Sequence, residues 1–307
     1  MPVGSSAERP APRGLDTLQE MVGTPAGRAR VLERVDGFIT YVEGARENIE
    51  KAQGLIVAGY VPVLYANHQS HADKLVLSGI TQRLAQSGAD DQFGGFLVPV
   101  AVTIESGAQG AYIQQLMVLF ETLYRDRGYG PDVPFITDND RQARGAVGNN
   151  TESVKRLMDA PRNRHGLVMF PEATLEGGRI GSNGNLNGMQ DVMQITGSGL
   201  IGYPKFWLKR GRGEAVFMPV GISGSYRMYP PDPGRDRISP EVVMGISGDG
   251  PSAPIVSISA GNPYTYTELR DEFKEEPDSK RKDHLDLMMR KVAELLPETE
   301  RGHYNRR

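Results

Sequence analysis

Apolar residues in the first fifty positions recur at intervals of three and four, which is the spacing of one face of an α-helix. The repeat runs from residue 26 to residue 52, with charged residues between its members. Its members are Val31, Leu32, Val35, Phe38, Ile39, Val42 and Ile49. The pattern predicts one amphipathic helix over 26–52, preceded by a shorter helix over 15–22. The apolar face of the long helix is explained either by packing against the rest of the protein or by contact with a membrane surface.

After Gly59 the pattern changes to short apolar runs that end in polar or glycine-rich turns, with helical stretches between them. The expected strands are 61–66, 96–104, 167–170, 215–222 and 255–260, and the expected helices are 70–86, 111–124, 151–158 and 266–296. This alternation is typical of an α/β fold, so we expect a mixed central sheet flanked by helices and preceded by a small N-terminal helical element. The expected organisation is a disordered leader over 1–14, the helical element over 15–53 and an α/β domain over 54–307.

Composition narrows the classes of partner. The chain carries 35 Lys and Arg residues against 38 Asp and Glu, for a formal net charge of -3, so no overall basic field points to nucleic acid. It has no cysteine, which excludes disulfides, thiolate nucleophiles and cysteine-ligated metals. No apolar run approaches the roughly 20 residues that span a bilayer, and residues 1–14 do not resemble a secretory signal. The sequence therefore predicts a soluble protein, or one that contacts a membrane without crossing it.

A histidine and an aspartate follow the first expected strand of the α/β region. Residues 67–73 read NHQSHAD, which places His68 and Asp73 five positions apart. On an ideal helix, side chains at that spacing point about 140° away from each other, so the two can meet only if His68 lies in the turn before the helix. Ser70 is a suitable N-cap, which would place Asp73 in the first helical turn. Asp73 could then fix the tautomer of His68 while the imidazole takes up a proton.

Two other interpretations of this block stay open. The spacing also arises by chance in a chain with five histidines, and Asp73 would then be an ordinary helix-capping carboxylate. Alternatively, His68, His71 and Asp73 could ligate a metal, although the three remaining histidines form no ligand-like cluster with them.

Two further blocks follow expected strands. Residues 170–174 read FPEAT, so a proline ends the strand and Glu172 projects just beyond it, with Thr174 two positions further on. Arg179 follows a Gly-Gly step and could grip a phosphate with two hydrogen bonds. An ordinary glycine-rich surface loop is the alternative for this segment. The third block is Pro219-Val220-Gly221, where proline inside an apolar run predicts an edge strand or a bulge.

Taken in order, these blocks resemble the glycerol-phosphate acyltransferase superfamily, which includes glycerol-3-phosphate and lysophosphatidate acyltransferases. NHQSHAD is similar to its His-x4-Asp block, FPEAT to its Phe-Pro-Glu-Gly-Thr block, and Pro219-Val220-Gly221 to its Pro-Val-Gly strand. The resemblance covers the middle of the chain. The absence of a membrane span and the helical N-terminal element look more like the soluble plastid-type glycerol-3-phosphate enzymes, which implies a cytoplasmic or stromal-like compartment or a membrane-associated location.

The resemblance implies an activity. His68 would be the general base and Asp73 its orienting carboxylate in transfer of a fatty acyl group to a hydroxyl of glycerol-3-phosphate or lysophosphatidate. The acyl donor would be a thioester of acyl carrier protein or coenzyme A, with no resident cofactor or metal. Acyl carrier protein and a membrane surface are the implied macromolecular partners, and nucleic acid is not one.

The resemblance also implies a substrate-binding set made of Glu172, Thr174 and Arg179. The sequence departs from the family at Ala173, where the family has glycine, and at Leu175, where it has a basic residue. Asp138 stands where a phosphate-contacting arginine is expected, so we expect Arg141 and Arg144 either to supply that charge from shifted positions or to be solvated surface residues. These departures leave a catalytically silent lipid-binding protein as a rival interpretation.

Overall fold

The computed structural model describes residues 19–69, 72–86, 93–102, 118–136, 146–171, 199–225, 254–274 and 281–305. Its strands are β1 (Ile39–Tyr41), β2 (Val61–Ala66), β3 (Phe96–Leu97), β4 (Pro99–Val102), β5 (Val133–Ile136), β6 (Gly166–Met169), β7 (Ala215–Ser223), β8 (Val256–Ala260) and β9 (Tyr264–Thr265). Its α-helices are α2 (Pro25–Gly37), α3 (Ala45–Val57), α4 (Asp73–Val76), α5 (Ser78–Ala85), α7 (Ala146–Met158), α8 (Gly199–Lys209), α10 (Tyr266–Lys274) and α11 (Arg281–Glu294). Residues 19–22 and 118–125 are also helical, and short 3-10 turns include η2 (Ala160–Asn163), η5 (Glu298–Glu300) and η6 (Gly302–Asn305).

The fold is α/β, as the sequence predicts, with a mixed central sheet. Within the described residues this sheet has seven strands in the order β1-β8-β7-β2-β6-β3, with β9 also paired to β7. The strands β7, β2, β6 and β3 are parallel neighbours, whereas β8 and β9 run antiparallel to β7. Because β2, β6 and β7 are parallel and adjacent, the residues that follow them meet at one edge of the sheet.

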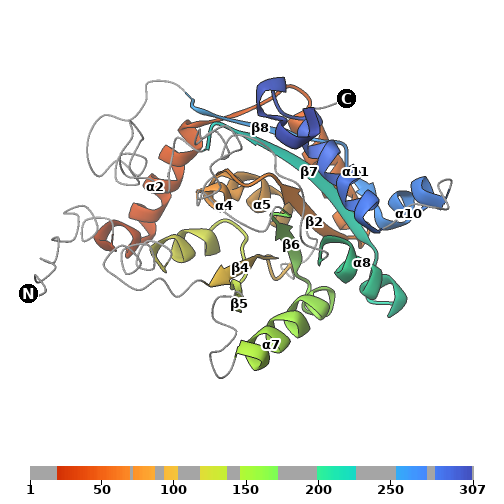
Figure 1. The fold of residues 1–307 in the computed structure, drawn as a ribbon. Helices are drawn as coiled ribbons and strands as arrows, with labels where there is room; N and C mark the ends of the chain where they lie inside the picture. The colour runs from red at the N-terminus through yellow and green to blue at the C-terminus, as the bar shows by residue number, and fades with distance from the viewer. Residues whose placement is uncertain are drawn as a thin grey trace, which may run out of the picture.

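Helices cover both faces of the sheet (Figure 1). On β2, Leu64 and Ala66 belong to one core cluster with α2, α3, α4 and α5. Val63 and Tyr65, which alternate with them, belong to a second cluster with α8, α10 and α11. Successive side chains of a strand point to opposite faces, so a strand buried on both faces needs apolar residues at every position. That requirement explains why the run 61–66 is apolar throughout and why its predicted bounds are confirmed.

The N-terminal region differs from the single helix expected over 26–52. It forms α2, then β1, then α3, and β1 pairs in parallel with β8 of the central sheet. Thr24 caps the start of α2 by accepting a bond from Gly27 N, and Gly44 adopts the left-handed φ of 80° just before α3. Most of the apolar stripe packs inward, as at the fully buried Val31 and Val35, whereas Val42 is 44% exposed. The three-and-four spacing of apolar residues continues across β1 because α2, β1 and α3 all contribute apolar side chains to one core.

Pro219 does not mark an edge strand or a bulge, contrary to expectation. β7 runs without interruption and lies between β2 on one side and β8 and β9 on the other. β9 pairs with Val216 and Phe217 and β8 pairs from Val220 onward, so Pro219 stands at the gap between these two neighbours. Its carbonyl accepts a hydrogen bond from Gly261 N in that gap, and the missing N–H lies on the same side, where no strand of the described residues requires it.

Other expected elements are divided. The run 96–104 contributes β3 to the central sheet and β4 to a two-stranded sheet with β5. The expected helix over 70–86 appears as α4 and α5, and that over 266–296 as α10 and α11. Helix α8 was not predicted, although its Trp207 is fully buried and donates to Leu157 O at 3.1 Å. No described helix combines the length and the apolar character that crossing a membrane requires.

Candidate catalytic site

The site lies where β2, β6 and β7 end at their shared edge. His68 and Gln69 follow β2, Phe170 follows β6, and Ser225 follows β7 after the turn at Gly224. Gly224 has a φ of 87°, and a Cβ atom there would lie 2.2 Å from Ile255 O. Glycine is therefore required for the turn that directs Ser225 back toward the end of β2.

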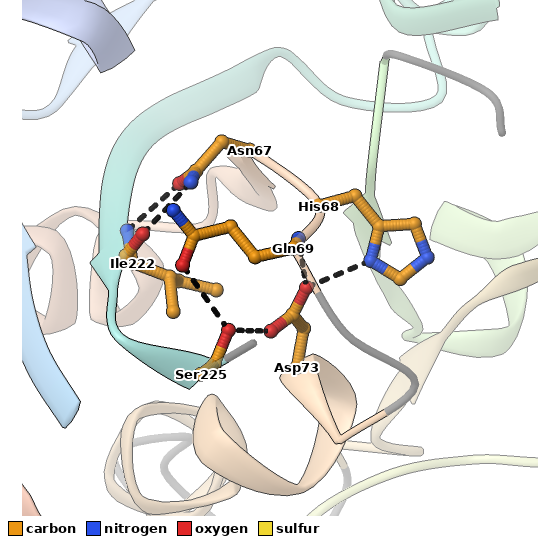
Figure 2. Close-up of polar contacts among 6 residues, drawn as sticks. All are labelled: Asn67, His68, Gln69, Asp73, Ile222 and Ser225. Carbon is orange, nitrogen blue, oxygen red and sulfur yellow. Dashed lines mark hydrogen bonds and ion pairs between the residues drawn. The ribbon is translucent and has the colours of Figure 1, made fainter. Parts of the chain in front are cut away.

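His68 and Asp73 form a hydrogen-bonded pair, as the sequence predicts. The imidazole Nδ1 lies 2.8 Å from Asp73 Oδ2, with the side chain of Asp73 fully buried and that of His68 18% exposed. A carboxylate accepts hydrogen bonds, so Nδ1 carries the proton and the basic lone pair is on Nε2. Figure 2 shows Nε2 on the side of the ring that faces away from Asp73. The pair can therefore take up a proton at Nε2 while Asp73 stabilises the resulting positive charge.

Asp73 is the first residue of α4, and its carboxylate accepts hydrogen bonds from two segments, the loop after β2 and the turn after β7. Gln69 N donates to Oδ2 at 2.6 Å, and the Ser225 hydroxyl donates to Oδ1 (Figure 2). The helix starts at Asp73 with Ala72 before it, rather than at the expected cap Ser70, which lies outside the described residues. These two bonds hold the carboxylate against the imidazole, because rotating it away would remove the acceptor of the buried Gln69 N–H and leave the Ser225 hydroxyl with the longer 3.4 Å bond to Gln69 Oε1.

Asn67 fastens the end of β2 to β7. Its Nδ2 donates to Ile222 O and its Oδ1 accepts from Ile222 N, both at 2.8 Å (Figure 2). In a parallel ladder the two backbone groups of a residue bond two different residues of the neighbouring strand, and here one side-chain amide bonds both groups of Ile222 just beyond the last β2–β7 pair, Ala66 with Val220. The main chain is thereby released from the sheet at the residue that precedes His68.

We expect Asn67→Ala to lower the free energy of unfolding by about 1–3 kcal/mol, because it leaves the N–H and C=O of buried Ile222 without partners. Urea unfolding followed by circular dichroism measures this. Asn48→Ala is the matched control, since the Asn48 side chain makes one bond to the backbone, to Ala260 O at 2.8 Å, and its other bond is an exposed one from Lys51 Nζ at 3.2 Å. The control should cost no more than about 1 kcal/mol. Equal losses of unfolding free energy in the two variants would contradict the importance of the two hydrogen bonds between Asn67 and Ile222.

Phe170 provides an aromatic wall for the imidazole. The two rings stack with their centroids 4.3 Å apart and their planes at 24°. The sequence placed this residue in the second block without assigning it a role. The stack limits rotation of the His68 ring and brings the end of β6 directly against the base.

Lys74, next to Asp73, anchors α4 from the other side. Its ammonium group pairs with Asp132 and lies over the rings of Tyr124 and Tyr129, at 4.1 and 5.1 Å from their centroids. Burial lowers the pKa of Lys74 and raises the pKa of Asp132, and the attraction between the two groups only partly offsets each shift. Tyr129 also donates to Lys74 O at 2.8 Å. These contacts fix the start of α4, and therefore Asp73, relative to the segment before β5.

Of the residues predicted for the site, the structure brings together His68 and Asp73. The expected substrate-binding residues Glu172, Thr174, Arg179, Arg141 and Arg144 lie outside the described residues, as does His71 of the alternative metal site. In the part of the chain that is described, no group of three or more histidine, aspartate or glutamate side chains is arranged to hold a metal.

Sequence reasoning missed Gln69, Ser225 and Glu300 as members of the site. Ser225 carries a recognisable signal, because it follows the carboxyl end of an expected strand just as His68 does. Glu300 carries none, since it lies in the C-terminal turn η5 and contacts the site only through the tertiary fold.

No protein-family model matches this chain, and no curated protein matches it.

Proposed function

We propose that this protein is an acyltransferase that moves a fatty acyl group from an acyl carrier protein or coenzyme A thioester to a hydroxyl of glycerol-3-phosphate. The observation that carries the proposal is the 2.8 Å bond between His68 Nδ1 and Asp73 Oδ2 at the carboxyl edge of parallel strands. A general base held in this way suits proton removal from a hydroxyl nucleophile. The resemblance of NHQSHAD, FPEAT and Pro219-Val220-Gly221 to the acyltransferase blocks supplies the substrate class.

In the proposed reaction, His68 Nε2 removes the proton of the acceptor hydroxyl as its oxygen attacks the thioester carbonyl carbon. Collapse of the tetrahedral intermediate breaks the C–S bond, and the imidazolium returns the proton to the departing thiolate. The products are an ester and a free thiol. Asp73 holds the imidazole in the required tautomer and compensates its transient charge.

Transfer without a covalent acyl-enzyme is favoured. The chain has no cysteine, so a serine would have to serve as the nucleophile. Ser225 is a described serine that contacts the His68–Asp73 pair. Its hydroxyl, however, donates to Asp73 Oδ1, on the far side of the carboxylate from the imidazole (Figure 2). A serine nucleophile would instead donate to the base itself.

A direct assay tests the function. Purified protein is offered glycerol-3-phosphate and lysophosphatidate side by side, each with acyl carrier protein and coenzyme A thioesters. We expect ester formation and thiol release in equal amounts, with glycerol-3-phosphate as the preferred acceptor. Preference for lysophosphatidate would assign the related activity on that acceptor. Lipid binding without turnover on any combination would instead favour the catalytically silent lipid-binding protein.

Dialysis against a strong chelator separates the acyltransferase from a metal-dependent hydrolase. Both Asp73 oxygens and His68 Nδ1 are already engaged with one another or with Gln69 and Ser225, an arrangement suited to proton transfer rather than metal ligation. We therefore expect neither kcat nor the melting temperature to change after dialysis. Activity that vanishes with the chelator and returns with zinc would favour the hydrolase.

A further inference from the structure

The C-terminal end of the described chain contacts the site through Glu300. This residue ends the turn η5, and its carboxylate accepts from Gln69 Nε2 at 3.1 Å and from the Ser223 hydroxyl at 2.7 Å. Gln69 belongs to the loop after β2, and Ser223 is the last residue of β7. One carboxylate therefore joins two segments that lie far from it in sequence, the first of them 231 positions away.

Both segments that Glu300 grips also hold Asp73. The backbone N–H of Gln69 donates to Asp73 Oδ2, and Gln69 is only 2% exposed. Two residues beyond Ser223, the fully buried Ser225 donates to Asp73 Oδ1 and lies 3.4 Å from Gln69 Oε1. A movement of Gln69 or of the end of β7 would therefore displace the carboxylate that orients His68.

The turn that carries Glu300 is itself fixed against the body of the protein. Arg301 Nε donates to Leu296 O at 3.1 Å, and Tyr304 donates to Asp286 Oδ1 of α11 at 3.2 Å. The end of α11 packs closely on β7, since a Cβ atom added at Gly221 would lie 2.9 Å from Leu295 Cβ. Glu300 is thus presented to the site from an anchored segment rather than from a loose chain end.

We propose that Glu300 is a positioning residue for the His68–Asp73 pair. Its two carboxylate oxygens hold Gln69 and Ser223 at the same time, and these hold the segments that fix Asp73. The C-terminal turn thereby sets the geometry of the base without touching the substrate. The kinetic part of this inference rests on the proposed acyltransferase function, whereas its structural part does not.

The test compares three variants of the full chain under conditions in which circular dichroism shows each to be folded. Glu300→Ala removes both acceptor oxygens, Glu300→Gln keeps one, and Glu298→Ala is the matched control from an exposed position of the same turn. We expect Glu300→Ala to lower kcat about tenfold to a hundredfold with KM for donor and acceptor changed less than about twofold, because a small misplacement of a catalytic group has effects of that size. Glu300→Gln should stay within about threefold of the natural protein, and Glu298→Ala should be unchanged.

A second measurement does not depend on turnover. The proton on His68 Nδ1, hydrogen-bonded to Asp73, gives a nuclear magnetic resonance signal that is assigned by its loss in His68→Ala. We expect this signal to be unchanged in Glu298→Ala, and shifted or broadened in Glu300→Ala because Asp73 moves. A loss of stability by itself would not move the signal of the molecules that remain folded.

The outcomes are separable. The positioning role would be overturned if Glu300→Ala had the same kcat as the natural protein. It would also be overturned if Glu300→Ala had a reduced kcat but an unchanged His68 signal. Glu300→Gln as impaired as Glu300→Ala would also overturn it, because the charge rather than the hydrogen bonds would then matter. If the natural protein shows no transfer with any donor and acceptor, the proposed function has failed, and the His68 signal alone decides whether Glu300 positions the pair.

Discussion

Replacing His68 with alanine should lower kcat for acyl transfer by about two to four orders of magnitude, the usual contribution of a positioned general base. The substitution removes the only group that the proposed mechanism uses to accept the hydroxyl proton. KM for the thioester should change little, because the imidazole acts on the proton rather than holding the donor. Steady-state kinetics with saturating acceptor measures both parameters.

The fold should survive this change, since the His68 side chain is partly exposed and its loss leaves Asp73 bonded to Gln69 N and the Ser225 hydroxyl. His284→Ala is the control, because His284 lies near the start of α11, whereas the site is contacted by the turn beyond the other end of that helix. Its kcat should stay close to that of the natural protein. Full activity in His68→Ala would exclude the proposed mechanism.

The second large effect is expected at Asp73, where asparagine and alanine should behave differently. Asparagine can keep its oxygen toward His68 Nδ1–H and Gln69 N–H while its amide donates to Ser225, whose hydroxyl can accept as well as donate. The tautomer of His68 is then preserved and only the negative charge is lost. We expect Asp73→Asn to lower kcat by about one to three orders of magnitude, less than or comparably to His68→Ala.

Asp73→Ala should also lose stability. It leaves the buried Gln69 N–H without this acceptor, at roughly 1–3 kcal/mol, and leaves the buried Ser225 hydroxyl with the longer 3.4 Å bond to Gln69 Oε1, at a smaller cost. Urea unfolding and kinetics on the same preparations separate the two effects. If the two Asp73 variants were equally stable, the carboxylate would not be holding these donors. If Asp73→Asn had the same kcat as the natural protein, the negative charge of Asp73 would not be required for transfer.

These predictions share one structural cause. Asp73 is fully buried and receives bonds from the loop after β2 and from the turn after β7, two segments that adjacent parallel strands deliver to the same edge. Asn67 joins the same two segments through Ile222, and Glu300 joins them again from the C-terminal turn. The base is therefore oriented by contacts that cross between β2 and β7 rather than by its own loop alone.

Short-range patterns in the sequence determined much of this arrangement. The bounds of β2 follow from an apolar run that both faces of a sheet must bury, and the ends of β7 and β8 were predicted to within a residue. Side chains five positions apart on one helix point away from each other, so the sequence allowed His68 to pair with Asp73 only from the turn before the helix, which is where it lies. Each of these conclusions depends on residues within a few positions of one another.

The tertiary structure alone decided the partners of that pair. The Ile222 partner of Asn67 is 155 positions away, the Ser225 partner of Asp73 is 152 away, and the Glu300 partner of Gln69 is 231 away. These contacts depend on the strand order β7-β2-β6 and on where the chain after α11 is anchored. The same dependence explains the wrong predictions at Pro219 and over 26–52. The structural consequence of a missing N–H or of an apolar stripe depends on which strand or core lies beside it. Hydrogen-bond partners are chosen by proximity in space, and a periodic pattern along the chain does not encode which distant segments become neighbours.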